Sequence, residues 1–293
     1  MPPIGRTEEV MPIDRGLIGK EWTQPPFEVT AAAIEALARA YGDENPLYLH
    51  GKDAVAPPVF ALIYAWEASV QPVFGFDPAL LMKLVRGGID LKLPVPVRAG
   101  DVVTTVAKLT EIEEKSSGEI VHIVTTSRRG DEVVAVIDNA HFIRGRRKDA
   151  AAAPGAATEP PPPEPGPVGA EVLRTSVTVD PEMPRRYGPP SQDVNPIHMD
   201  DSVAQAAGFP SIILQGSCTM ALAGKAIVDG LAGGDARRLK RLAVRFSKPV
   251  LPNDVLTTVG RDAGKDGGLR RVAFETLNQS GVAVLKDGLA ELA

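Results

Sequence analysis

Two stretches of the chain repeat each other, and this repeat constrains the fold more than any other feature. Residues 41–48 read YGDENPLY and residues 191–198 read SQDVNPIH, so Asp, Asn and Pro recur at a spacing of 150 residues. A second echo, PVRAGDV at residues 96–102 against PVLPNDV at 249–255, has a spacing of 153 residues. Two echoes at nearly one spacing indicate a duplicated unit.

A run of alanine, proline and glycine over residues 149–169 separates the two copies. This composition favours an extended chain and cannot build a packed element. The segment on each side has an ordinary domain length. We therefore expect an N-terminal domain over residues 1–148, a linker over 149–169 and a C-terminal domain over 170–293.

Composition argues against several classes of protein. With 44% hydrophobic and 24% charged residues, the chain has the balance of a globular protein. A net charge of −5, without a basic stripe interleaved with aromatic residues, argues against a nucleic-acid partner. No apolar run approaches the roughly 20 residues of a membrane span. The single cysteine, Cys218, has no partner for an internal disulfide and offers no metal-ligand spacing. We expect a cytoplasmic protein with no metal site and no membrane segment.

The residue pattern predicts the same kinds of element in both halves. In the first half we expect helices over 31–40 and 58–70, then strands over 88–93, 101–112, 119–127 and 132–144. In the second half we expect a strand over 172–179, helices over 202–207 and 216–231, then strands over 238–246, 255–262, 269–278 and 282–290. The predicted strands are rich in Val, Ile and Thr, which favour extended chain.

The longest predicted helices, 58–70 and 216–231, are apolar nearly all round. A helix without a polar face is buried. When consecutive antiparallel strands follow such a helix, their sheet must wrap around it. The sequence therefore predicts two α+β units, which can pair into one continuous sheet.

The second copy of the repeat carries the residues most suited to chemistry. Asp193 and His198 are separated by an Asn-Pro pair, and proline fixes its own backbone and disfavours helix in the residue before it. An irregular loop could turn both side chains into one pocket, as acid–base catalysis needs. The alternative is structural: Asp193 and Asn195 cap a turn, and His198 is an ordinary loop histidine.

The second half resembles the MaoC-like (R)-specific enoyl-CoA hydratases and dehydratases. The residues that carry the resemblance are Tyr187, Ser191, Asp193, Asn195, Pro196 and His198, then Ala207-Gly208-Phe209, Ile213-Leu214-Gln215-Gly216 and Arg245-Phe246-Ser247-Lys248-Pro249-Val250. The first half resembles the N-terminal domain of two-domain members, through residues 42–48 and 56–60. The resemblance implies a double hotdog fold. This sequence departs from the family pattern at Gln192, where the family usually has glycine. A side chain at that position could alter the loop or enter the pocket.

The resemblance also implies a reaction: the reversible syn addition of water to a trans-2-enoyl thioester, which gives a (3R)-hydroxyacyl thioester. Asp193 and His198 would share one water, and Asn195 would orient one of them or fix the loop. Gly216 begins the buried helix, where main-chain N–H groups have no helical partner. Its N–H would form an oxyanion hole for the thioester oxygen.

Further residues are candidates for substrate binding, with the coenzyme A phosphates assigned to Arg245 and Lys248. The candidates are Ser191, Gln192, Tyr187, Arg245, Lys248, Gln215 and Ser217. Ser191 and Tyr187 fit structural roles better than catalytic ones. In the first copy Tyr48 replaces the histidine and cannot exchange a proton near neutral pH, so we expect that domain to be inert. It would leave room for a bulky acyl chain, with a tunnel along Phe60, Tyr64 and Trp66, whose simpler interpretation is core packing.

Three functions stay open at this point. The first is an acyl-CoA hydratase that needs no metal or dissociable cofactor, since coenzyme A is part of its substrate. The second is a 3-hydroxyacyl-ACP dehydratase of lipid synthesis, with the same chemistry on another carrier. The third is a non-catalytic protein that binds acyl thioesters, its site closed by Gln192. A further homodimer is compatible with a two-unit chain but not required.

Overall fold

The computed structural model describes residues 13–74, 84–115, 118–144 and 169–293. The predicted linker, 149–169, lies outside the described residues except for Gly169. The strands are β1 (Glu21–Thr23), β2 (Phe27–Glu28), β3 (Leu84–Lys92), β4 (Val102–Lys115), β5 (Gly118–Arg129), β6 (Glu132–Arg144), β7 (Glu171–Thr178), β8 (Leu239–Phe246), β9 (Val255–Asp266), β10 (Leu269–Leu277) and β11 (Ala283–Leu292). The α-helices are α1 (Ala31–Ala40), α2 (Ala61–Tyr64), α3 (Trp66–Phe74), α5 (Met183–Ser191), α6 (Asp201–Ala206) and α7 (Gly216–Leu231). The 3-10 helices in the described residues are η1 (Arg15–Leu17), η2 (Gly51–Asp53), η3 (Pro58–Phe60), η4 (Pro196–His198) and η5 (Ala236–Arg238).

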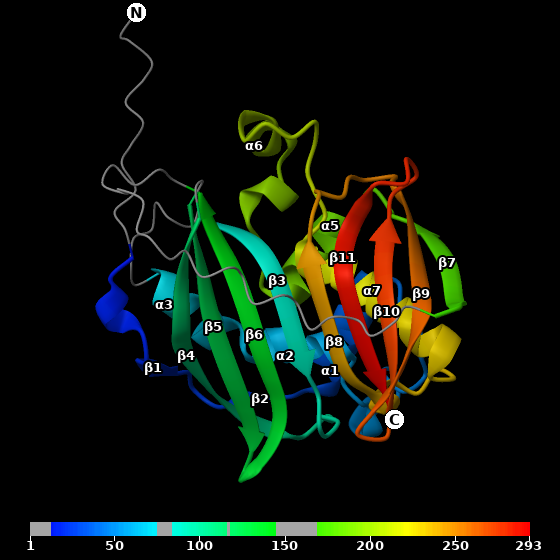
Figure 1. Cartoon of the computed structure of the whole chain (residues 1–293). Coiled ribbons are helices and arrows are strands. Elements are labelled where there is room, and N and C mark those ends of the chain that lie inside the picture. The colour runs from blue at the N-terminus through cyan, green and yellow to red at the C-terminus, as the bar shows by residue number, and fades with distance from the viewer. Residues whose placement is uncertain (1–12, 75–83, 116–117, 145–168) are drawn as a thin grey trace, which may run out of the picture.

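The strands of the two halves join into one antiparallel sheet (Figure 1). Its order is β1-β4-β5-β6-β3-β8-β11-β10-β9-β7, and β2 pairs with β4. The joint between the halves is the pairing of β3 with β8, from Gly88 opposite Arg245 to Lys92 opposite Arg241. The predicted continuous sheet is therefore confirmed.

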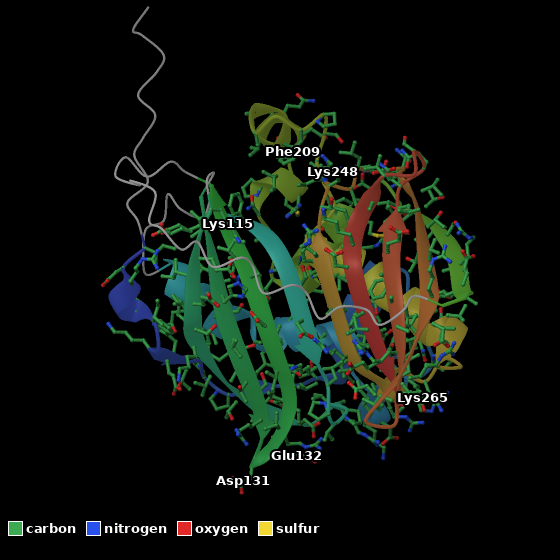
Figure 2. All side chains as sticks on the ribbon, in the orientation of Figure 1. Lys115, Asp131, Glu132, Phe209, Lys248 and Lys265 are labelled. Atoms are coloured by element: carbon green, nitrogen blue, oxygen red, sulfur yellow. The ribbon has the colours of Figure 1, made fainter. Side chains whose placement is uncertain are left out.

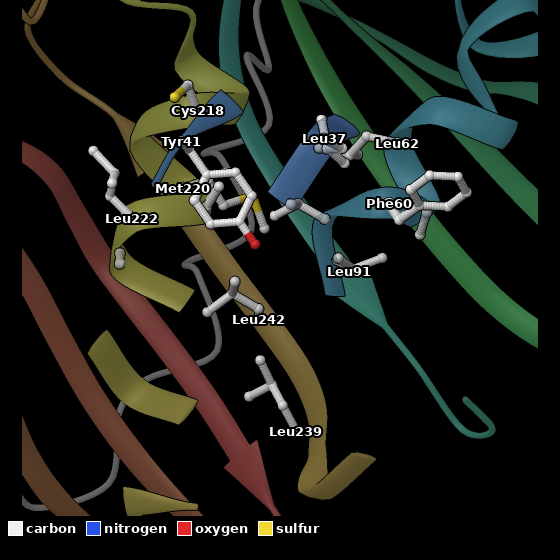
Figure 3. Close-up of a cluster of buried hydrophobic side chains, with 14 of the residues drawn as sticks. Leu37, Tyr41, Phe60, Leu62, Leu91, Cys218, Met220, Leu222, Leu239 and Leu242 are labelled. Carbon is white, nitrogen blue, oxygen red and sulfur yellow. The ribbon is translucent and has the colours of Figure 1, made fainter. Parts of the chain in front are cut away.

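The long helix of each half packs against this sheet. Helix α7 coincides with its predicted span, and ten of its residues are buried. The first-half helix was predicted as one piece over 58–70, but it is divided into η3, α2 and α3 by a break at Ala65. Buried side chains of both halves, among them Leu37, Phe60, Met220 and Leu242, form one core (Figure 3). The two units therefore share their apolar interior.

The two copies of the repeat also match in their hydrogen bonds. Asn45 Oδ1 accepts from the Leu47 N–H at 3.0 Å, and Asn195 Oδ1 accepts from the Ile197 N–H at 3.3 Å. In the second echo, Asp101 and Asp254 each accept from the N–H three residues before them, at 2.9 and 2.8 Å. The sequence echoes thus mark equivalent turns, which supports a duplicated unit.

Helix α5 was not predicted. Its sequence, MPRRYGPPS, contains three prolines and a glycine, all poor helix formers. Pro184 is tolerated because it lies in the first turn, where N–H groups have no partner anyway. Among the helices of the described chain, none is both long and apolar enough to cross a membrane.

A partly buried ion pair crosses the joint between the halves. Arg241 on β8 donates from Nε and Nη2 to the two carboxylate oxygens of Asp90 on β3, at 2.8 and 2.7 Å. Its Nη1 donates to Glu291 on β11 at 3.4 Å. Two-point contacts of this kind are stronger than single ones and fix the relative position of the strands.

We expect Arg241→Met to lower the free energy of unfolding by about 1–2 kcal/mol, because it leaves Asp90 and Glu291 without this partner at partly buried positions. The matched control is Arg174→Met, which removes an exposed pair with Glu171 and should change stability much less than Arg241→Met does. Urea unfolding measures both. Equal effects would mean that the pair does not stabilise the joint.

Candidate active site

The loop that carries Asp193 and His198 begins where α5 ends. Gln192 caps the helix with a left-handed backbone, φ 61°, and the chain then turns through Asp193 into η4, which ends at His198. Ser191 Oγ donates to the Gly188 carbonyl at 3.0 Å and accepts from the Asp193 N–H at 3.3 Å. Helix α5 and η4 therefore fix the two ends of the loop, which explains why the side chains of Asp193 and His198 converge.

Asp193 and His198 face each other, as predicted. His198 Nε2 lies 3.8 Å from Asp193 Oδ1, and the two side chains are 9% and 18% exposed. The other ring nitrogen, Nδ1, is 2.8 Å from the Ile213 carbonyl oxygen. A carbonyl only accepts, so Nδ1 carries a hydrogen and, in the neutral imidazole, Nε2 carries a lone pair.

The pair is suited to hold one water between its members. Burial lowers the pKa of His198, although Asp193 and the Ile213 carbonyl oppose this effect, so the ring is neutral near pH 7. Its Nε2 and a carboxylate oxygen then both accept hydrogen bonds, and neither can donate to the other. A water molecule has two O–H donors and could satisfy both acceptors at once. This arrangement can remove a proton from that water.

The start of α7 lies against the same loop. Gln215, the residue before the helix, donates from Nε2 to the main-chain oxygens of Pro184 and Asp193, at 2.9 and 3.2 Å. The next residue is Gly216, and no acceptor for its N–H occurs in the described ranges. A Cβ at Gly216 would lie 3.2 Å from the Phe246 ring, so a glycine fits this close packing. The free N–H at a helix start can stabilise an oxyanion.

The other residues predicted for this region mostly brace it. Asn195 is exposed and its side-chain oxygen caps η4, which matches the loop-fixing role. Gln215 is fully buried, and its amide holds main-chain oxygens. Tyr187 is also fully buried, its ring packs edge-on to Tyr41 of the first half, and its hydroxyl has no hydrogen-bond partner among the described residues. Ser191, as described above, braces the loop.

The predicted phosphate-binding residues lie on the surface. Arg245 is exposed and its Nε donates to Asp287 at 2.6 Å, so a phosphate would have to compete with that carboxylate. Lys248 follows β8 and is exposed at the end of the molecule that carries α6 (Figure 2). Phe60 and Tyr64, predicted to line a tunnel, are buried and in ring contact, which favours core packing.

The equivalent loop of the first half has a different environment. Tyr48 is buried at the position of the histidine, and Tyr41 donates from its hydroxyl to Asp43 at 3.2 Å. Burial raises the pKa of Asp43, against the opposing charge of Lys225, whose Nζ lies 3.7 Å away. An open surface hollow of about 610 Å³, lined in part by Asn45 and Lys225, lies beside this loop and not beside Asp193.

The sequence interpretation missed one charged residue near the pair. Arg86 is the third residue of β3 and the first whose side chain is described, and it lies upstream of the predicted strand start at residue 88. Burial lowers the pKa of Arg86 and the charge of Asp193 raises it, so the two groups interact across the halves. No sequence signal could have found this residue, because it lies on a strand 107 positions away from Asp193.

Gln192 stands at a backbone position that favours glycine. Its φ of 61° is left-handed, as is the φ of 74° at Gly42, the equivalent residue of the first half. The Gln192 side chain is exposed. Glutamine in place of glycine therefore strains the loop backbone slightly, and its side chain does not fill the pocket.

We expect Gln192→Gly to raise the free energy of unfolding by about 0.5–1 kcal/mol, because relief of left-handed strain exceeds the added chain entropy. The reciprocal control, Gly42→Ala, should lower it by about 1 kcal/mol, since no atom lies near its Cβ and only the backbone is affected. Thermal and urea unfolding measure both. A loss of stability in Gln192→Gly would contradict this explanation.

Comparisons with known proteins bear on both halves. A model of the MaoC-like domain matches residues 165–283, and a model of the FAS1-like dehydratase domain region matches residues 16–136. The chain is 30% identical over 281 residues to 3-hydroxyacyl-thioester dehydratase Y of Mycobacterium tuberculosis, over 87% of this chain and 91% of that protein. It is 27% identical over 233 residues to peroxisomal enoyl-CoA hydratase 2 of Arabidopsis thaliana, over 74% of this chain and 73% of that protein.

The fold has a close counterpart among solved structures. A MaoC-like dehydratase from Phytophthora capsici superposes with a TM-score of 0.76 at 20% identity, over 97% of this chain and 98% of that chain. At this identity the likeness concerns the fold alone, which is the predicted double hotdog. Together with the identity to the mycobacterial dehydratase along nearly the whole of both chains, it shows that this chain belongs to the MaoC-like hydratase and dehydratase family, in its two-domain form.

Proposed function

We propose that the protein is an (R)-specific enoyl-CoA hydratase, or 3-hydroxyacyl-thioester dehydratase, that adds water reversibly to trans-2-enoyl thioesters. The observation that carries the proposal is the buried pair of acceptors, Asp193 Oδ1 and His198 Nε2, 3.8 Å apart. The names of the two relatives support the same reaction in its two directions.

The mechanism follows from the geometry of the pair. One member takes a proton from the shared water as the water oxygen adds to C3, and that proton is then delivered to C2 from the same face. The other member accepts the second O–H of the water and holds it in place. Two coupled groups titrate as a unit, so the base and the acid are assigned to the pair. The main-chain N–H of Gly216 stabilises the negative charge that develops on the thioester oxygen, a contribution of about 3–4 kcal/mol in enzymes where it is measured. The reaction transfers no electrons, and we propose that it needs no metal or dissociable cofactor.

The carrier and the acyl chain are the open parts of the proposal. Coenzyme A is favoured over an acyl carrier protein by the name of the plant relative. A cytoplasmic location is also a proposal, based on the single buried cysteine without a disulfide. A homodimer would add a further pairing to a chain that already contains two units.

We expect Asp193→Asn and His198→Ala each to lower the turnover of crotonyl-CoA by at least about 100-fold, because each removes one acceptor for the attacking water. Loss of absorbance of the conjugated thioester measures the rate, and circular dichroism checks the fold. The matched control is Tyr48→Phe, at the equivalent position of the first half, which should keep the rate within about threefold.

The same assay separates the alternatives. Faster turnover of an enoyl-ACP than of the enoyl-CoA would identify the lipid-synthesis dehydratase. Measurable binding with no turnover at any chain length would identify a non-catalytic acyl-thioester binding protein. Near-normal rates in both site variants would mean that Asp193 and His198 have the wrong assignment.

A further inference from the structure

Arg86 brings a charge of the first half to the active site of the second. It lies on β3 opposite His141 of β6, and two residues before Gly88, which pairs with Arg245 of β8 across the joint. The next residue of β8, Phe246, is the one whose ring packs on Gly216. Arg86 is therefore at the end of the joint that adjoins the start of α7.

The guanidinium of Arg86 has no carboxylate partner within the part of the chain that the structure describes. Its side chain is half-buried, and its described contact is the ring of Trp66, with the guanidinium carbon 5.9 Å from the ring centre. Arginines in such surroundings are usually paired with an acid, because removing a charge from water is unfavourable. An unpaired, half-buried guanidinium beside a candidate active site suggests a role in that site.

The charge that acts on Arg86 from the second half is that of Asp193. Burial lowers the pKa of Arg86, and the charge of Asp193 raises it. Burial is the main cause that lowers the pKa of His198; Asp193 and the Ile213 carbonyl oppose it, and Arg86 lowers it further. His141, opposite Arg86, adds no charge, because burial, Arg86 and His122 lower its pKa to about 3.

We propose that Arg86 is a positioning residue of the active site: from the first half, its unpaired guanidinium attracts the carboxylate of Asp193 and helps to keep the imidazole of His198 neutral, so that both accept from one water. This proposal rests on the proposed function for its kinetic consequences, but its electrostatic claim can be tested separately. It gives the otherwise inert first half a part in the chemistry.

The kinetic test is the pH dependence of kcat/KM for crotonyl-CoA hydration. Removing the positive charge makes protonation of His198 easier, so Arg86→Met should move the acid limb of the pH profile to higher pH by about half a unit or more. Arg86→Lys keeps the positive charge, so the acid limb of its pH profile should lie close to that of the wild type. Lys92→Met removes an exposed lysine near the other end of β3 and should leave the limb in place.

The second test does not need turnover. The chain has only four histidines, so the His198 ring signal can be assigned in NMR spectra by its loss in His198→Ala. Titration of this signal should show a higher pKa in Arg86→Met than in the wild type, again by about half a unit or more, and an intermediate or unchanged value in Arg86→Lys. If Arg86→Met does not fold, the same titration is carried out on Arg86→Gln.

The outcomes distinguish the two proposals. An unchanged His198 titration in both neutral variants, within about 0.2 units, would overturn the role of Arg86 whatever the wild-type activity. Failure of the wild type to hydrate any enoyl thioester would overturn the proposed function, while a shifted titration would still establish that Arg86 acts on the pair.

Discussion

The pairing of β3 with β8 is the interaction on which the rest of the structure depends. It joins two sheets into one, so that the apolar side chains of both halves share a core. It also sets the start of α7, through Phe246, and the position of Arg86 relative to the catalytic loop. Main-chain hydrogen bonds hold the two strands together, and side chains specify their register, among them the two-point contact of Arg241 with Asp90.

The two copies show how one loop geometry supports different chemistry. Both keep the Asn-Pro turn and a left-handed residue before the aspartate. In the second copy a histidine faces the aspartate, with its tautomer set by the Ile213 carbonyl. In the first copy a buried tyrosine takes that place and the aspartate interacts with Lys225 instead. The turn geometry is therefore common to both copies, whereas in the second copy a histidine lies 3.8 Å from the aspartate and in the first a tyrosine occupies that position.

Much of this arrangement could be predicted from the sequence, and the limits have physical causes. Strand β6 and helix α7 were predicted at their observed bounds, because hydrophobic patterns report burial directly. Helix α5 was missed because propensity penalises its prolines, whereas packing against the first half holds it in place. The convergence of Asp193 and His198 followed from local chain geometry. Arg86 could not be predicted, since its place near them depends on strand pairing between distant segments.

The central claim is that Asp193 and His198 act together on one water. The rates of crotonyl-CoA hydration by Asp193→Asn, His198→Ala and the double variant test it most directly. Groups that serve one step as a unit lose most of their effect when either is removed. The account predicts that the double variant is no more than about tenfold slower than the slower single variant. Losses that multiply fully would contradict it, because they would show that the two residues contribute independently.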